Sequence, residues 1–185
     1  MSAFPKPYAD RVAKLRVPFG FVLAIAFAWF SRPSPRSLWI GLPVSVLGLL
    51  LRGWATGHLE KNIRLAESGP YAYVRNPLYL GTLLVAAGLV VAARQWVLAL
   101  IFTAVFLLVY LPVIELEEQH LRALFPEFAD YSRRVPALLP RLRARTTRQA
   151  FRWGLYVRNR EYQALLGFAA GAAFLVGKML LTARG

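Results

Sequence analysis

The residues best placed to do chemistry lie in the segment SGPYAYVRNPLYLG, residues 68–81, at the start of a long apolar run. Gly69-Pro70 is a turn signal, and Pro77 can begin a helix because its missing N–H would be unpaired there anyway. The start of that helix is a potential anion site, and Arg75 adds a bidentate positive charge. The neighbouring tyrosines offer faces that bind cations. The cluster suits a ligand with both a carboxylate and a sulfonium cation. Tyrosine and arginine also anchor helix ends at membrane interfaces, which is the alternative.

A second cluster holds three glutamates, Glu115, Glu117 and Glu118, at the end of a later apolar run. Acidic side chains at a membrane interface are costly unless they have partners. On a helix, Glu115 and Glu118 share a face, whereas Glu117 points elsewhere. These carboxylates could accept hydrogen bonds from hydroxyl or amino groups of a ligand, pair with Arg75, or form salt bridges with the abundant arginines. His120 follows, and we interpret it as a polar surface residue.

Five apolar segments must position these clusters. They cover residues 17–30, 38–51, 78–93, 96–114 and 164–181. A spanning helix needs about 20 residues, so 96–114 suffices alone and 78–93 nearly does. The first two segments need flanking residues, or they form a hairpin that does not fully cross. The very short link at residues 94–95 predicts adjacent antiparallel helices. We therefore predict an all-α integral membrane protein with about five transmembrane helices, whose loops form a cofactor pocket.

Composition narrows the function classes. The chain of 185 residues is 57% hydrophobic and carries a formal net charge of +14. Because the basic residues sit between long apolar runs, the charge indicates an anionic membrane surface rather than a nucleic acid. The sequence has no cysteine and two histidines, which excludes a disulfide framework, a thiolate nucleophile and a multi-histidine metal site. We predict no metal site.

The distribution of charge predicts an orientation. Segments 52–77 and 115–161 hold many of the basic residues and should face the cytosol, as should the N-terminus. The apolar segment 17–30 lacks a cleavage signal and is interpreted as retained. The site is therefore expected on the cytosolic face of a membrane, the bacterial inner membrane if the protein is prokaryotic.

We interpret residues 1–185 as a single membrane domain. Within it, residues 63–141 form a core, 142–161 a basic arm, and 162–182 an additional C-terminal transmembrane helix. The arm reads as an amphipathic segment on an anionic leaflet, with a solvated basic linker as the alternative. Membrane lipids, anionic ones included, are therefore expected partners.

The core resembles the isoprenylcysteine carboxyl methyltransferase family and the related phospholipid methyltransferases. Their pattern G-x-Y-x-x-x-R-H-P-x-Y-x-G is matched by residues 69–81, except that Asn76 replaces the histidine. The following E-E-x-x-L matches residues 117–121. An aromatic stretch with two proline motifs then matches residues 125–140. The pieces occur in order, separated by one predicted hairpin.

The resemblance implies a methyltransferase that uses S-adenosylmethionine in a cytosolic pocket and takes a lipophilic or prenylated substrate from the bilayer. The residues implied to line the cofactor pocket are Leu65, Tyr71, Asn76, Pro77, Leu78, Tyr79 and Glu117. The substrate is an isoprenylcysteine-like carboxylate or a lipid amine or hydroxyl. A carboxylate needs no base, whereas an amine or hydroxyl needs one, for which Glu118 or Glu115 is the candidate. Arg75 and Glu118 are the predicted catalytic residues.

Two departures bear on the substrate. Asn76 can donate a hydrogen bond but cannot shuttle a proton near neutral pH. Val113 stands where the eukaryotic prenylcysteine enzymes carry an arginine for the substrate carboxylate, which argues against that substrate. Two alternatives stay open: an NADPH-dependent membrane reductase of the sterol-reductase type, which shares a similar R-H-P-x-Y-x-G element, and a non-catalytic membrane scaffold.

Overall fold

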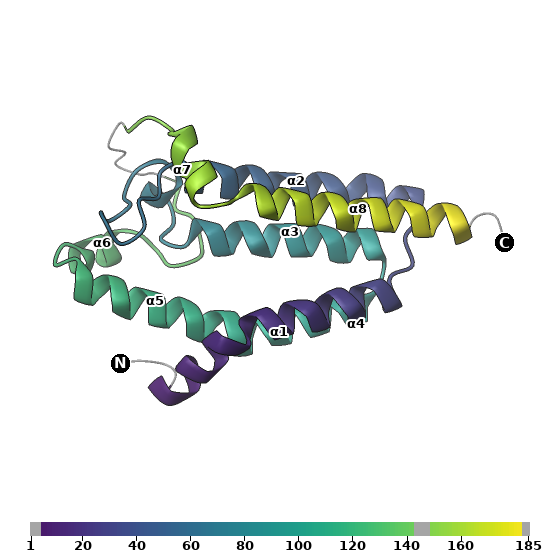
Figure 1. Cartoon of the computed structure of the whole chain (residues 1–185), viewed down its shortest axis with the longest axis horizontal. Coiled ribbons are helices and arrows are strands. Elements are labelled where there is room, and N and C mark those ends of the chain that lie inside the picture. The colour runs from purple at the N-terminus through teal and green to yellow at the C-terminus, as the bar shows by residue number, and fades with distance from the viewer. Residues whose placement is uncertain (1–4, 143–148, 183–185) are drawn as a thin grey trace.

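The computed structural model describes residues 5–142 and 149–182, and every regular element within these ranges is helical (Figure 1). The elements are α1 Lys6–Phe30, α2 Pro35–Thr56, η1 Gly69–Ala72, α3 Pro77–Ala93, α4 Trp96–Val105, η2 Phe106–Tyr110, α5 Leu111–Leu124, α6 Phe128–Arg134, α7 Trp153–Arg158 and α8 Tyr162–Thr182. The prediction of an all-α membrane protein is confirmed, and each of the five apolar segments is helical.

Three helices of the described chain are long and apolar enough to cross a membrane: Pro35–Thr56, Trp96–Leu124 and Tyr162–Thr182. α1 becomes a fourth candidate if its two parts, which meet at a bend of 51°, count as one span. Pro18 lies inside α1 and accounts for the bend. α3 has 17 residues, at the short end of what a bilayer requires. The second segment is longer than its apolar run, because α2 continues to Thr56, so it does not need the partial hairpin.

The ends of the helices follow from local sequence. Ser34 and Ser37 form a reciprocal capping box at the start of α2, with Ser34 Oγ accepting from the Ser37 N–H at 3.3 Å. Arg94 adopts a left-handed conformation (φ 55°) that ends α3. The short link at residues 94–95 makes α3 and α4 antiparallel, as predicted, but the closest helix packing of α3 is with α2.

Small residues bring α2 and α3 into backbone contact. A methyl group added to Gly41 would lie 2.3 Å from the carbonyl oxygen of Gly88, and one added to Gly48 would lie 2.6 Å from that of Gly81. Ser45 Oγ donates across the same interface to the Val85 carbonyl at 2.9 Å. Van der Waals packing and interhelical hydrogen bonds drive helix association in lipid, so this stripe is the main attachment of α3.

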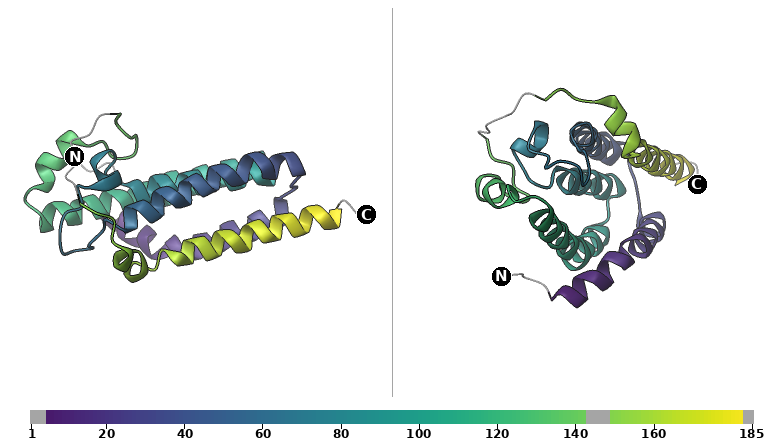
Figure 2. Two further views of the ribbon diagram at one scale, coloured as in Figure 1. Left: turned by 90° about the horizontal axis from the view of Figure 1, so that it is seen from above. Right: turned by 60° about the vertical axis from the view of Figure 1, so that its left-hand side comes forward.

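The long helices form two groups, which Figures 1 and 2 show side by side. α2, α3 and α8 pack in one group, while α1 packs on the continuous helix of α4, η2 and α5 in the other. A hydrophobic cluster of Leu38, Ala92 and Leu175, covered by Phe27, joins the groups at one end. The Lys178 ammonium donates to the Ala28 carbonyl at 2.8 Å and so closes the C-terminus of α1 from α8.

The turns sort to opposite ends of the bundle. The Arg32 N–H donates to the Ala93 carbonyl at 2.8 Å, which joins the α1–α2 turn to the α3–α4 turn. The segments 57–76, 125–142 and 149–161 lie at the other end, around η1, α6 and α7 (Figure 1). Both predicted site segments are therefore on one face. That this face is cytosolic stays a prediction.

Candidate functional site

The start of α3 is held in place by the chain that follows α6. The N–H groups of Arg75 and Asn76 donate to the carbonyls of Pro136 and Ala137 at 2.9 and 3.1 Å. The Arg141 N–H donates back to the Tyr73 carbonyl at 3.1 Å. These hydrogen bonds bring the two sequence motifs together. The Asn76 side-chain amide adds a further bond, to the Ala137 carbonyl 61 positions away in the chain.

Arg75 and Glu118 form the centre of the site. Arg75 Nε and Nη2 donate to the two carboxylate oxygens of Glu118, each at 3.0 Å. Its Nη1 donates to the carbonyls of Ser132 and Val135 at 2.6 and 3.0 Å. The Asn76 amide adds a bond of 2.9 Å to the same Glu118 oxygen that Arg75 Nε contacts. Of the alternatives that the sequence left open for the glutamates, pairing with Arg75 is the one that Glu118 adopts. Arg75 thereby ties together α3, α5 and the end of α6.

Glu117 and Tyr79 form a second, more open pair. The Tyr79 hydroxyl donates to Glu117 Oε1 at 2.9 Å, and the Tyr79 ring packs edge-on against Tyr110 with 6.1 Å between centroids. Glu117 is exposed. Tyr110 ends the π-helix η2, a rare element that often marks functional sites. Glu117 therefore remains accessible to a ligand.

Two further predicted residues lie in the packed layer beneath. Leu65 belongs to a hydrophobic core with Phe125, Phe128 and Tyr131. The Tyr131 hydroxyl donates to the Tyr71 carbonyl at 2.9 Å. Burial, with the nearby Tyr131 and Glu117, raises the pKa of the Tyr71 phenol far above its ordinary value. Burial likewise raises the pKa of Tyr131. Both phenols are neutral supports of the loop under ordinary conditions.

The first turn of α3 presents the predicted backbone donors. Pro77 occupies the first helical position, as expected, and is fully buried. The Leu80 N–H makes the first helical bond, to the Asn76 carbonyl at 3.1 Å. The N–H groups of Leu78 and Tyr79 precede that bond and point out of the helix start, where an anion is favoured.

An ion pair that the sequence did not indicate supports this turn from the other side. Arg52 on α2 makes a bidentate contact with Glu161, with Nε–Oε1 at 2.6 Å and Nη2–Oε2 at 3.0 Å. Its Nη1 donates to Thr82 Oγ1 at 2.6 Å and to the Leu78 carbonyl at 3.3 Å. Glu161 is buried, at 7% exposure. The sequence offered one indication of this pair, which is that Glu161 is an isolated acidic residue at the end of the basic arm.

The described part of the arm also forms hydrogen bonds to the loop that links α2 to η1. Gly69 has a left-handed conformation (φ 57°), and an added methyl group there would lie 2.8 Å from the His58 ring. The His58 ring nitrogens lie 3.0 Å from the Trp54 carbonyl and 3.2 Å from the Gln149 carbonyl. Ser68 Oγ donates to the Gln149 side chain at 3.0 Å. Residues 143–148 of the predicted arm lie outside the described residues.

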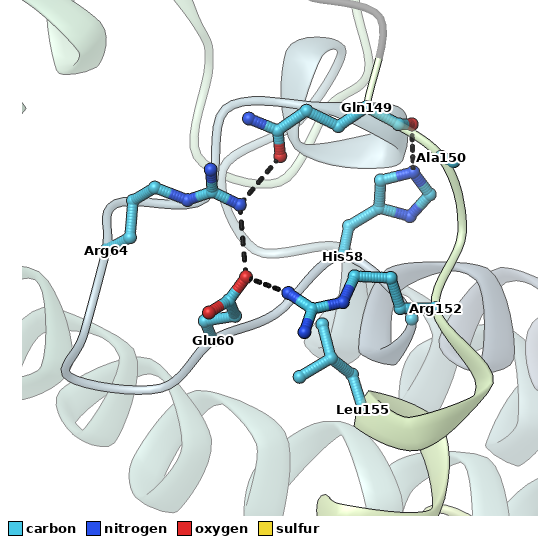
Figure 3. A pocket seen from close by; sticks show the side chains of 8 residues that line it. His58, Glu60, Arg64, Gln149, Ala150, Arg152 and Leu155 are labelled. Carbon is cyan, nitrogen blue, oxygen red and sulfur yellow. Dashed lines mark hydrogen bonds and ion pairs between the residues drawn. The ribbon is translucent and has the colours of Figure 1, made fainter.

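A pocket of about 290 Å³ opens between this loop and the arm (Figure 3). It is lined by Gly57, His58, Glu60, Arg64, Gln149, Ala150, Arg152 and Leu155. None of these is a predicted cofactor residue. Leu65, next to Arg64, instead faces the core around α6, so the pocket and the Arg75–Glu118 site lie on different sides of the loop.

Of the nine predicted site residues, seven are brought together by direct hydrogen bonds or by the helix start, and Leu65 and Tyr71 lie in the supporting layer. The first set is Arg75, Asn76, Pro77, Tyr79 and the glutamates 117–118, with Leu78 in the same turn. Glu115 accepts a long bond of 3.4 Å from Gln119. His120 is exposed, as interpreted from the sequence. Within the described residues no group of three or more His, Asp or Glu side chains could hold a metal ion.

Residues 39–127 match the model of the phospholipid methyltransferase family. The protein-S-isoprenylcysteine O-methyltransferase of Schizosaccharomyces pombe is 26% identical over 141 residues, which is 73% of this chain and 59% of that protein. The resemblance seen in the sequence is confirmed. Both of these matches carry the name of a methyltransferase. No solved structure matches the chain significantly.

Two relatives carry names of another kind. The cobalt-zinc-cadmium resistance protein CzcN of Cupriavidus metallidurans is 37% identical over 139 residues, covering 71% of this chain and 64% of that protein. The nickel-cobalt-cadmium resistance protein NccN of Alcaligenes xylosoxydans xylosoxydans is 37% identical over 116 residues, covering 62% of this chain and 53% of that protein. The matches thus span between half and two thirds of these curated relatives.

Proposed function

We propose, from the match of residues 39–127 to the phospholipid methyltransferase family, that this chain transfers a methyl group from S-adenosylmethionine to a lipophilic substrate at the cytosolic membrane face. The observation that carries the proposal is the pairing of the two family motifs through Arg75, Asn76 and Glu118. That network fixes the start of α3 beside Glu117, which is the arrangement a cofactor with a carboxylate and hydroxyl groups requires.

The residues present fit this cofactor. The N–H groups of Leu78 and Tyr79 at the start of α3 suit a carboxylate, and the Glu117 carboxylate can accept hydrogen bonds from hydroxyl or amino groups. The Tyr79 ring offers a face for a cation. We propose that Leu65, Tyr71 and Pro77 keep this surface in shape from beneath. When bound, S-adenosylmethionine supplies a methyl group that is activated by its sulfonium charge.

We propose that Arg75 and Glu118 act through position. All four of the hydrogen bonds from Arg75 described above go to protein groups, and Glu118 accepts from both Arg75 and Asn76. A general base must present an open lone pair to the proton that it removes. Glu118 would have to give up a bond to Arg75 or Asn76 to do so. A carboxylate nucleophile avoids this requirement, and alignment of the nucleophile with the methyl group then carries the rate.

The names of two relatives refer to metal resistance. Methyl transfer is compatible with such a role if the methylated molecule is a component of the membrane. The sequence has no cysteine, and the described residues lack a metal-binding cluster. We therefore propose that any contribution of this chain to metal resistance comes from methylation of a membrane component, and not from metal chelation by the chain itself.

The test is isothermal titration of S-adenosylmethionine and S-adenosylhomocysteine into detergent-purified protein. Binding should weaken at least tenfold in Glu117→Ala, because about one hydrogen bond to a charged group is lost. Binding should also weaken in Arg75→Ala, because the start of α3 is then no longer held in place. Glu127→Ala is the matched control, because Glu127 is an exposed glutamate at the neighbouring α6 and should bind like the wild type.

Absence of binding by both ligands, in detergent and in lipid nanodiscs, would sink the proposal. NADPH would then be the next ligand to titrate, since a membrane reductase is the alternative of the same architecture. Where binding is found, transfer of a labelled methyl group into a lipid extract from the host identifies the acceptor.

A further inference from the structure

We propose that the pocket between the α2–η1 loop and the arm binds the phosphate of an anionic phospholipid headgroup, at a site separate from the proposed reaction. The pocket residues that carry the inference are His58, Glu60, Arg64, Gln149 and Arg152 (Figure 3). The proposal does not depend on methyl transfer, because none of these residues belongs to the Arg75–Glu118 site.

Two guanidinium groups from distant parts of the chain converge in this pocket. Arg64 Nη2 donates to Glu60 Oε1 at 3.2 Å and to the Gln149 side chain at 2.9 Å. Arg152 Nη1 donates to the same Glu60 oxygen at 2.5 Å. Glu60 therefore gathers both arginines at a single point while neutralising only one of them. The pocket keeps an excess positive charge.

The arginines retain donors for a ligand. Each guanidinium has five N–H groups in a fixed fork, and in each only one terminal nitrogen is engaged with the pocket residues. Their side chains are 50% and 60% exposed. Forked, charge-assisted donors match phosphate geometry better than they match a single oxygen. An anion with several oxygens can thus bind the outward-facing N–H groups without displacing Glu60.

The position of the pocket relative to the membrane favours a lipid over a soluble phosphate. α2, a candidate membrane span, ends at Thr56, and the pocket begins at the next residue, Gly57. The pocket therefore lies where an embedded α2 leaves the bilayer, at the level of the headgroups.

An aromatic rim points to the same depth. Trp54, His58, Phe151 and Trp153 form a continuous series of edge-to-face contacts, with centroids 6.4, 6.2 and 5.0 Å apart. Trp54 and Trp153 are 45% and 71% exposed. Tryptophan is characteristic of the membrane–water interface, and exposed rings beside paired arginines suit a molecule with a phosphate and an acyl chain.

The experiment is native mass spectrometry of the full chain in a neutral detergent, with phosphatidylglycerol or phosphatidylcholine added at equal concentration. The wild type should retain phosphatidylglycerol in preference. The variant Arg64→Gln/Arg152→Gln should bind it about tenfold more weakly, as expected for the loss of charge-assisted bonds to phosphate. The control Arg158→Gln/Arg160→Gln removes the same charge from exposed arginines that do not line the pocket, and should bind like the wild type.

Three results would overturn the proposal. The first is equal loss in both double variants, which would assign binding to diffuse surface charge. The second is displacement of the lipid by inorganic phosphate at comparable concentration, which would make the ligand a soluble anion. The third is a parallel loss of S-adenosylhomocysteine binding in Arg64→Gln/Arg152→Gln alone, which would place the cofactor in this pocket.

A second measurement needs no variant and therefore stands even if the substitutions impair folding. Phosphatidylglycerol with a photoreactive headgroup, incorporated in nanodiscs with the wild-type chain, should crosslink to peptides that contain residues 57–64 or 149–155. Crosslinks confined to other basic segments would contradict the proposed site.

Discussion

Arg75 Nε lies 3.0 Å from Glu118 Oε1, and this bidentate ion pair joins the start of α3 to α5 across 43 positions of sequence. The side chains are only 14% and 20% exposed. A pair held at this depth between two helices has a structural consequence that can be measured apart from any activity.

Arg75→Lys and Glu118→Gln should each lower the free energy of unfolding by about 1–3 kcal/mol. The lysine ammonium cannot reproduce the bidentate contact, and Glu118→Gln leaves the partly buried Arg75 charge without its partner. Since the two groups contact each other, the double variant should lose clearly less than the sum of the single losses. Thermal denaturation of the four proteins in one detergent gives the cycle. Additive losses would show that the two side chains act independently.

The Arg52–Glu161 pair should matter for both stability and ligand binding. Glu161→Ala leaves the Arg52 guanidinium unpaired beside the first turn of α3, so we expect a loss of about 1–3 kcal/mol together with weaker S-adenosylhomocysteine binding. Glu67→Ala is the control, because its 3.4 Å contact with Arg134 is exposed and should contribute less than about 1 kcal/mol. Similar melting temperatures for Glu161→Ala and the wild type would refute the supporting role.

The glycines between α2 and α3 should not tolerate a side chain. An alanine Cβ at position 88 would lie 2.4 Å from the Gly41 carbonyl oxygen and 2.3 Å from Ser45 Oγ, so Gly88→Ala should destabilise by about 1–3 kcal/mol through overpacking. Gly167→Ala on α8 has open space and should be neutral or slightly stabilising, because alanine favours a helix. Equal melting temperatures for the two variants would contradict the close approach of α2 and α3.

Stability should fall at alkaline pH because of two buried phenols. Burial raises the pKa of Tyr71 and Tyr131 in the folded state, whereas an unfolded tyrosine titrates near pH 10. The unfolded chain therefore releases protons above about pH 10 that the folded chain retains, and stability is lost from there upward by up to about 1.4 kcal/mol per pH unit for each residue. Melting temperatures of the wild type and Tyr71→Phe between pH 8 and about 11 should show a steeper decline in the wild type; parallel curves would exclude this origin.

The orientation can be read by single-cysteine labelling, because the chain has no cysteine of its own. Leu139 is 80% exposed in the segment after α6, and Gln95 lies in the turn at the other end. An impermeant maleimide should label Leu139→Cys only from the cytosolic side and Gln95→Cys only from the opposite side. Reversed labelling would place the proposed site on the other face of the membrane.

The membrane class, the helical segments and the two motifs could all be predicted before the fold was known. Hydropathy and length are local properties, so α2, α8 and the span Trp96–Leu124 could be predicted from them. The motif at residues 69–81 likewise predicted a turn and a helix start, because the backbone conformations that Gly69 and Pro77 favour depend on those residues alone.

Which side chains contact one another could not be predicted without the packed fold. α3 packs on α2 because small residues of the two helices lie opposite each other. The spacing of small residues along one helix does not show which other helix will pack against it. The contacts of Glu161 with Arg52 and of Arg152 with Glu60 join residues 109 and 92 positions apart. Sequence spacing carries no information about such pairs, since they depend on where the arm returns after α6. The same reason explains why the sequence left open whether the glutamates contact a ligand or Arg75, whereas the structure shows Glu118 bonded to Arg75 and Asn76.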